Sequence, residues 1–290
     1  MRMNRTLGAA GVGVMFLSQA VVSAAPIAVS GGQSPTGSSA FSLDFGAFGG
    51  VASARITQTQ FALEVDAAQG QARFAAYHQL VEPLTLPGGF STGNIQVEVV
   101  AGSSAGTFDD LTGEFNTSEE YAIHFDGDLS AFGLTSPVIL PSTSAGRVLV
   151  RAVEGGSVLM DWRGTSELPN PFDPNSTIAF AYTCSVDAVF AASSETLVQL
   201  ALIPNVINLG LARGVENRLL RPLESASDAI DAGRDRPAAR SLNNFADRVE
   251  AQRGSSLSDE EADGLISDAQ GAIDLLGSAL RDAPDKGRSR

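Results

Sequence analysis

The chain has 290 residues, with 19 Lys and Arg against 33 Asp and Glu, and a formal net charge of −14 at pH 7. This surplus of negative charge argues against binding to nucleic acid or to an anionic membrane surface, because both are themselves densely negative. Cys184 is the single cysteine, so no intrachain disulfide forms. The length is sufficient for one large domain or two smaller ones.

The first 24 residues have the pattern of a secretory signal peptide. Arg2 and Arg5 supply positive charge, Leu7 to Val22 is an apolar stretch that is too short and too interrupted by glycine for a membrane span, and Val22-Ser23-Ala24 is a small-residue cleavage site. The sequence therefore predicts cleavage after residue 24 and export, either to the periplasm or out of the cell. Residues 283–290 form a polar tail and predict no anchor.

Residues 25–40 are rich in Gly, Ser and Pro and predict a flexible leader. From residue 41 to 191 the apolar residues recur with period two, which is typical of strands with one buried face. Short glycine-containing turns such as AAQGQ separate these runs, and no helical period lies between them. The pattern predicts an all-β antiparallel sandwich or jelly roll. Its buried face includes Phe61, Leu63, Val65, Tyr121, Ile123, Trp162, Ile178, Phe180, Tyr182 and Cys184.

The period changes near Glu195, and residues 195–282 predict a small α-helical bundle of four segments. In the third segment Ala238, Leu242, Phe245 and Val249 lie on one stripe. The last segment begins at Ser258, whose spacing to Glu261 predicts a capping box.

Within this region the segments NLGLARGVENRLLRPLESASDAID, ARSLNNFADRVEAQRG and LSDEEADGLISDAQGAIDLL have a recognisable order and spacing. Residues 197–277 resemble the FIMAH domain, a helical module appended to many secreted bacterial proteins. The resemblance implies an accessory role on an exported protein and brings no catalytic residues with it. Pro222 departs from the family pattern and predicts a kink or interruption in its helix.

The stretch Gly102-Ser103-Ser104-Ala105-Gly106 matches the G-x-S-x-G motif of a nucleophile elbow. In that interpretation Ser104 is a nucleophile with Asp109 and His124 as partners. An elbow requires a helix directly after the serine, and here turn-forming residues and another strand follow. The string Ser-Ala-Gly also recurs at Ser144, before a further strand. We therefore favour a turn at Ser104 and keep the catalytic interpretation as an alternative.

Two acidic loops are candidates for calcium, which prefers oxygen ligands. Asp109, Asp110 and Glu114 lie in one loop, and Asp126 and Asp128 in another. A zinc site has little support, because the chain has two histidines and one cysteine. By alternation His124 shares the outer face with Glu120, and His78 shares a face with Phe74 and Leu80, which predicts partial burial.

Aromatic platforms for sugar binding are not evident, since Trp162, Tyr121 and Tyr182 fall on apolar faces. The sequence thus predicts an exported, non-enzymatic surface, matrix or binding protein with an extracellular ligand or surface component as partner. No cofactor is expected other than calcium. The alternatives are a secreted, glycosidase-like hydrolase that uses the acidic loop residues, and a ligand-carrying barrel with an apolar cavity.

Overall fold

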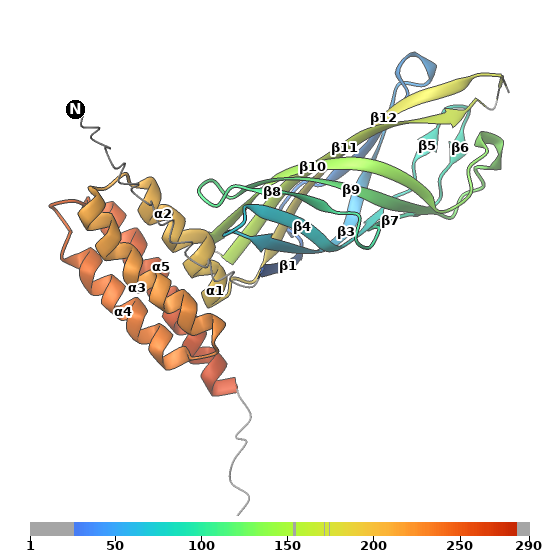
Figure 1. Cartoon of the computed structure of the whole chain (residues 1–290). Helices are drawn as coiled ribbons and strands as arrows, with labels where there is room; N and C mark the ends of the chain where they lie inside the picture. Colours follow the sequence, from blue (N-terminus) through green and yellow to red (C-terminus); the bar gives the residue numbers. More distant parts are fainter. Residues whose placement is uncertain (1–25, 153–154, 171, 174, 283–290) are drawn as a thin grey trace, which may run out of the picture.

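Figure 1 shows the computed structural model, in which an elongated β region carries a helical region at one end. The structure describes residues 26–152, 155–170, 172–173 and 175–282, so the predicted signal peptide and polar tail lie outside it. The predicted order, antiparallel β structure followed by a helical bundle, is confirmed.

The β region consists of one ten-stranded sheet and a separate two-stranded ribbon, and every pairing in them is antiparallel. The strands are β1 (Ile27–Gln33), β2 (Ala40–Asp44), β3 (Val51–Asp66), β4 (Gln71–Val81), β5 (Thr85–Leu86), β6 (Phe90–Ser91), β7 (Ile95–Val99), β8 (Ala105–Phe108), β9 (Glu114–Phe125), β10 (Val138–Arg151), β11 (Gly155–Pro169) and β12 (Thr177–Phe190).

The large sheet closes on itself through the pairing of β3 with β4. β1 and β2 share the position between β3 and β12, and β7 and β8 share the position between β4 and β9. From β3 to β12 the strands follow one another around the sheet in chain order, and β12 then pairs with β1 and β2 to complete the closure. This is a meander, without the crossing connections of the Greek keys in a jelly roll.

Residues 27–33, expected to belong to a flexible leader, instead form β1. Ile27 and Val29 are buried and pair with the inner positions of β3. Gly31 lies so close to β12 that a side chain there would collide with Val189 and Phe190. The glycine content that indicated flexibility thus serves close packing of one strand against the next.

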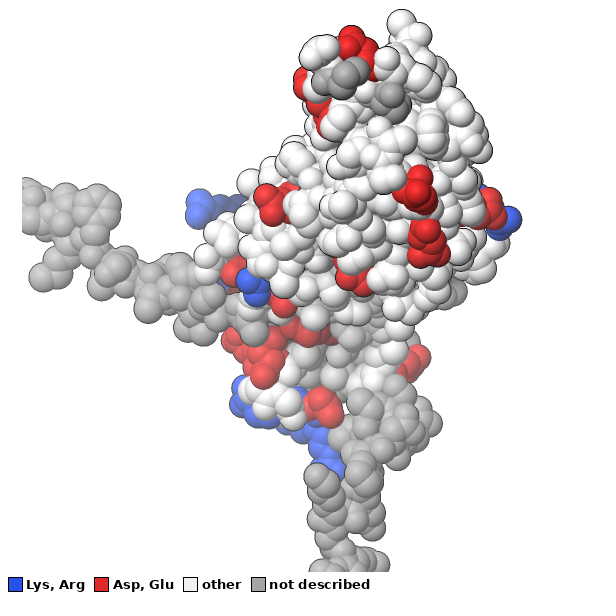
Figure 2. All heavy atoms as spheres, turned by 90° about the vertical axis from the view of Figure 1, so that its right-hand side faces the viewer, with Lys and Arg blue, Asp and Glu red and all other residues white. Residues whose placement is uncertain are grey.

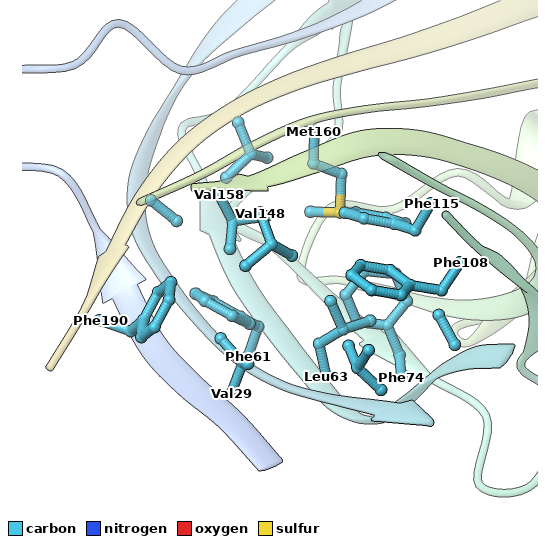
Figure 3. Close-up of a cluster of buried hydrophobic side chains, with 14 of the residues drawn as sticks. Val29, Phe61, Leu63, Phe74, Phe108, Phe115, Val148, Val158, Met160 and Phe190 are labelled. Atoms are coloured by element: carbon cyan, nitrogen blue, oxygen red, sulfur yellow. The ribbon is translucent and has the colours of Figure 1, made fainter. Parts of the chain in front are cut away.

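The interior of the closed sheet is filled by side chains, most of them apolar (Figure 3). Trp162, Tyr121 and Tyr182 are 0 % exposed, as predicted. The Trp162 ring lies 4.8 Å from that of Tyr121. Cys184 is also buried there, and burial raises the pKa of its thiol to about 12, so it is not a reactive thiolate.

The helical region begins directly after β12 and contacts the end of the sheet that we call proximal. The opposite end, with β5 and β6, is the distal end. The predicted stripe Ala238, Leu242, Phe245 and Val249 is fully buried. The helical elements are α1 (Ser194–Leu197), the π-helical turn η3 (Val198–Leu202), α2 (Ile203–Asn208), α3 (Arg213–Asp231), α4 (Asp235–Glu250) and α5 (Asp259–Asp282).

The capping box predicted at the start of α5 is present. Ser258 N donates to Glu261 Oε2 at 2.7 Å, and Glu261 N donates to Ser258 Oγ at 3.2 Å. Of the helices in the described part of the chain, none has both the length and the apolarity needed to cross a membrane.

Pro222 does not interrupt its helix, since α3 runs continuously from Arg213 to Asp231. A proline at this position cannot donate to the carbonyl of Arg218, four residues earlier. That carbonyl instead accepts from Arg248 Nη1 of α4 at 2.6 Å. The donor that the proline removes is thus replaced from the neighbouring helix.

We predict that Arg248→Leu lowers the free energy of unfolding by about 0.5–1.5 kcal/mol, because it leaves the Arg218 carbonyl without this donor. In a Pro222→Ala background the same substitution should cost less, because alanine restores the backbone N–H. A double-mutant cycle by urea denaturation measures this coupling. Equal costs in the two backgrounds would show that Arg248 does not compensate for the proline.

Candidate functional site

The two acidic loops lie at opposite ends of β9. Asp109, Asp110 and Glu114 are at its proximal end, and Asp126 and Asp128 follow its distal end. The strand between Glu114 and Phe125 spans roughly 36 Å at about 3.3 Å per residue. The structure therefore does not bring the two groups of carboxylates together.

Within each loop the carboxylates stabilise the backbone of their own turn. Asp109 Oδ1 accepts from Leu111 N at 2.9 Å and from Thr112 N at 3.0 Å. Asp128 Oδ1 accepts from Ser130 N at 3.0 Å, and hydrogen bonds from Ser130 lower the pKa of Asp128. Among the residues that the structure describes, no group of three or more His, Cys, Asp and Glu is placed to hold a metal ion.

Ser104 occupies the interruption between β7 and β8. Its Oγ accepts from Phe74 N of β4 at 2.9 Å, and Ser103 Oγ accepts from Glu120 N of β9 at 3.0 Å. The two hydroxyls thus bind backbone groups of β4 and β9 where the intervening strand is broken. The turn in this segment lies at Ala101 and Gly102, and β7 and β8 run in the same direction along β9, so Ser104 does not form the chain reversal that we expected.

Ser104 and Asp109 lie at the two ends of β8, beside β9, whereas His124 is near the distal end of β9, so the three side chains do not meet. Ala105 pairs with Ser118, so His124 lies about six residues further along the strand, roughly 20 Å at about 3.3 Å per residue. Asp109 is at the other end of β9. The Ser-Ala-Gly string at Ser144 also proves to be no turn, because it lies inside β10.

His78 faces away from Phe74, contrary to the expectation from strict alternation. The register of β4 against β3 shifts where Ala62 pairs with Ala76 and Leu63 with Phe74, so Ala75 is an extra residue. A bulge of this kind reverses which residues face inward after it. Tyr77 and Gln79 consequently point into the interior, and His78 joins the outer face, where it is partly buried.

On that face both histidines of the chain approach one carboxylate. His78 Nε2 lies 4.0 Å from Glu98 Oε1, and His124 Nε2 lies 4.0 Å from Glu98 Oε2. Gln96 Nε2 also donates to Glu98 Oε1 at 2.6 Å. The carboxylate approaches each ring through a different oxygen, and both separations exceed hydrogen-bond length.

Glu119 is a buried carboxyl group that we did not predict from the sequence. Glu119 is two residues before Tyr121 in β9, so both side chains point to the same face of the strand. That face is the interior, where Glu119 is 3 % exposed. Its Oε1 accepts from the Ser144 hydroxyl across the β9–β10 pairing. Burial raises the pKa of Glu119, and hydrogen bonds from Ser144, Thr117 and Tyr121 partly offset that rise.

This pKa shift makes a pH-dependent contribution to stability. Because the folded protein holds the proton more tightly, the contribution is full below the unfolded-state pKa, near 4.3, and is lost as the pH rises through the folded-state pKa. We expect Glu119→Gln to remove this pH dependence. The variant should therefore exceed the native chain in free energy of unfolding by more at pH 7 than at pH 4. Denaturation curves of both proteins from pH 4 to 8 measure the difference. Parallel stability profiles would contradict a raised pKa.

A cleft of about 520 Å³ lies between the proximal end of the sheet and the helices. One wall is formed by Leu111 to Gly113 of the β8–β9 turn, by Arg147 to Arg151 of β10 and by Ala152, which follows β10. Leu200 of η3, Asn205 of α2 and Asp268 of α5 belong to the other. The cleft therefore exists only where both regions are present.

Hydrogen bonds fix the two walls of the cleft relative to each other. Asn208 Nδ2 of α2 donates to the Leu111 carbonyl at 2.8 Å, and Ala152 N donates to Asp268 Oδ1 at 3.3 Å. Gly271 allows α5 to approach, because a side chain there would collide with Ala152.

The cleft contains more positive than negative charge, unlike the chain as a whole. Arg147 and Arg151 are exposed at its β wall, and Asp268 is half-buried at its helical wall. Arg147 Nε donates to the Thr112 carbonyl at 2.7 Å, which orients its guanidinium. Burial raises the pKa of Asp268, and the Ala152 N–H and the charge of Arg151 act in the opposite direction.

Comparison of the chain with protein-family models and with curated proteins finds no match.

Proposed function

We propose that the chain is an exported, non-enzymatic binding protein whose ligand occupies the cleft between the β region and the helical region. The observation that carries this proposal is that polar groups from both regions converge at the cleft, whereas the candidate catalytic residues are dispersed along β9. The volume of about 520 Å³ falls within the range of roughly 300–1,000 Å³ for small-molecule sites, which often lie at domain interfaces.

The charge of the cleft favours an anionic ligand. Guanidinium groups pair with carboxylates through planar hydrogen bonds, and two of them border this space. Leu111, Leu200 and Pro204 add apolar surface beside them. The ligand chemistry that fits is a small carboxylate-bearing molecule with an apolar part.

The signal-peptide pattern at residues 1–24 supports export of this binding protein. The resemblance of residues 197–277 to a FIMAH domain supports an accessory role for the helices. In this proposal the accessory module also completes the ligand site.

A citrate titration followed by thermal unfolding tests the proposal, with citrate serving as the probe for the carboxylate part of the ligand. We expect a saturable rise in Tm. Arg147→Glu should weaken citrate binding by about tenfold or more. Arg163→Glu is the matched control, because Arg163 is an exposed arginine of β11 outside the cleft. An absent or non-saturable response, or equal responses of the two variants, would contradict binding in the cleft.

The alternative of a secreted hydrolase requires two carboxyl groups about 5–9.5 Å apart if it acts as a glycosidase. The acidic loops at the two ends of β9 do not provide such a pair between them. Labelling of Ser104 by a fluorophosphonate probe would favour a serine hydrolase instead. We expect no labelling, because Ser104 is buried and bonded to the backbone of β4.

A further inference from the structure

A second hollow lies inside the distal end of the closed sheet, separate from the cleft. Its volume is about 70 Å³, and the lining exposed to it is apolar. Ile123 of β9 and Leu140 of β10 contribute the sheet side, while Leu86 and Leu129 come from segments that cover this end. An apolar hollow of this kind stays dry and offers its contacts to an apolar ligand.

Thr92 is the one polar residue among the described residues of the lining, and its hydroxyl already takes part in hydrogen bonds. It accepts from Leu84 N at 2.9 Å and donates to the Gly93 carbonyl at 2.9 Å. Of the residues that the structure describes, none with a charged side chain borders the hollow. The described lining therefore offers a ligand no polar group without a hydrogen-bond partner.

The hollow is not sealed from solvent. Leu43, Phe125, Leu134 and Val138 belong to its lining and are only partly buried. An engineered apolar cavity of about 150 Å³ accommodates benzene. A space of about 70 Å³ therefore takes a short aliphatic chain, or the end of one, with the remainder at the opening.

The charges at the distal end decide which head group such a chain can carry. The distal segments 44–51, 82–94, 126–137 and 169–177 contain no Lys or Arg. Their charged residues are Asp44, Glu82, Asp126, Asp128 and Asp173. Figure 2 looks onto this end and shows scattered acidic side chains on a largely uncharged surface. A carboxylate or phosphate head group would be repelled here.

Exposed aromatic rings add apolar surface at the same end. Phe172 is 63 % exposed and Phe48 is 39 % exposed, and their ring centroids lie 6.0 Å apart. They come from the turns between β11 and β12 and between β2 and β3. Neighbouring exposed rings of this kind offer apolar surface to a ligand at the opening.

From this geometry we propose that the distal hollow is a binding site for a ligand with a short aliphatic chain and no negative charge, such as an alcohol or ester. The chain enters between the partly buried side chains and contacts Ile123, Leu129 and Leu140. Burial of its methylene groups drives binding, and the acidic loops exclude anionic amphiphiles of the same length.

Methyl NMR of the intact chain tests this site with three probes of equal chain length, 1-hexanol, hexanoate and hexylamine. We expect saturable shifts with hexanol at the methyl groups of the lining, and binding of hexanoate about tenfold weaker or less. Leu134→Phe and Val138→Phe each place a ring in the hollow and should abolish the shifts. Val51→Phe is the matched control, because Val51 is 65 % exposed and lies outside the lining.

Two variants that fill the hollow keep the test valid if one of them fails to fold. Absence of saturable hexanol shifts in the native chain would overturn the proposal, as would unchanged binding by a folded filling variant. Binding of hexanoate as tight as that of hexanol would overturn the exclusion of anionic ligands, as would binding of hexylamine no tighter than that of hexanoate. Loss of citrate binding has no bearing on this result, because the cleft is at the other end of the sheet.

Discussion

Trp162→Ala is expected to lower the free energy of unfolding by about 3–5 kcal/mol, the cost of removing a large aromatic side chain from a packed core. Trp162 is 0 % exposed, and its ring lies among those of Phe41, Tyr121 and Tyr182. Its Nε1 also donates to the Tyr77 hydroxyl at 3.3 Å. Alanine would leave a cavity and remove that donor.

Urea denaturation monitored by far-UV circular dichroism measures this loss. Leu159→Ala is the control, because Leu159 is on the outer face of the same strand and is 50 % exposed. Its cost should stay within about 0.5 kcal/mol, as for most surface substitutions. Equal costs at both positions would contradict an interior that depends on this aromatic cluster.

Leu202→Ala is expected to cost about 2–5 kcal/mol, because it creates a cavity where the helical region meets the sheet. Leu202 is 0 % exposed in η3, the element that contacts β10, α3 and α5. The same substitution should weaken citrate binding, since neighbouring Leu200 and Ala201 line the cleft.

Denaturation curves and citrate titrations of Leu202→Ala measure the two effects together. Leu111→Ala provides the control for stability, because Leu111 is 39 % exposed on the opposite side of the junction. Its stability cost should stay within about 0.5 kcal/mol. An unchanged free energy of unfolding in Leu202→Ala would contradict tight packing of the helices on the sheet.

In segments where apolar residues recur at regular intervals, the direction of the side chains was predictable from the sequence alone. Alternation placed Phe61, Leu63 and Val65 in the interior, and the helical stripe at Leu242 and Phe245 is buried as predicted. Such patterns succeed because one buried face is enough to fix which side chains point inward. The fold class followed from the change of period near residue 195.

Local irregularities were not predictable in the same way. The bulge at Ala75 reverses which residues of β4 face inward, so His78 faces outward and Gln79 inward. A bulge depends on pairing with another strand, and no residue in the local sequence marks it here. Conversely, Glu119 has the parity of Tyr121, so its inward direction was present in the sequence.

The cleft could not be derived from the sequence. Leu111, Arg147 and Asp268 are far apart along the chain and meet only after the helices dock on the sheet. The individual residue types are common on protein surfaces, and no local spacing connects them. The distal hollow has the same origin, since its lining comes from many strands and loops.

A crystal structure of the chain soaked with citrate shows directly whether the cleft is the ligand site. We expect citrate in the cleft, with its carboxylates on Arg147 or Arg151 and its other side against the helical wall. An empty cleft at saturating citrate, or citrate bound elsewhere, would contradict the assignment of this cleft as the ligand site.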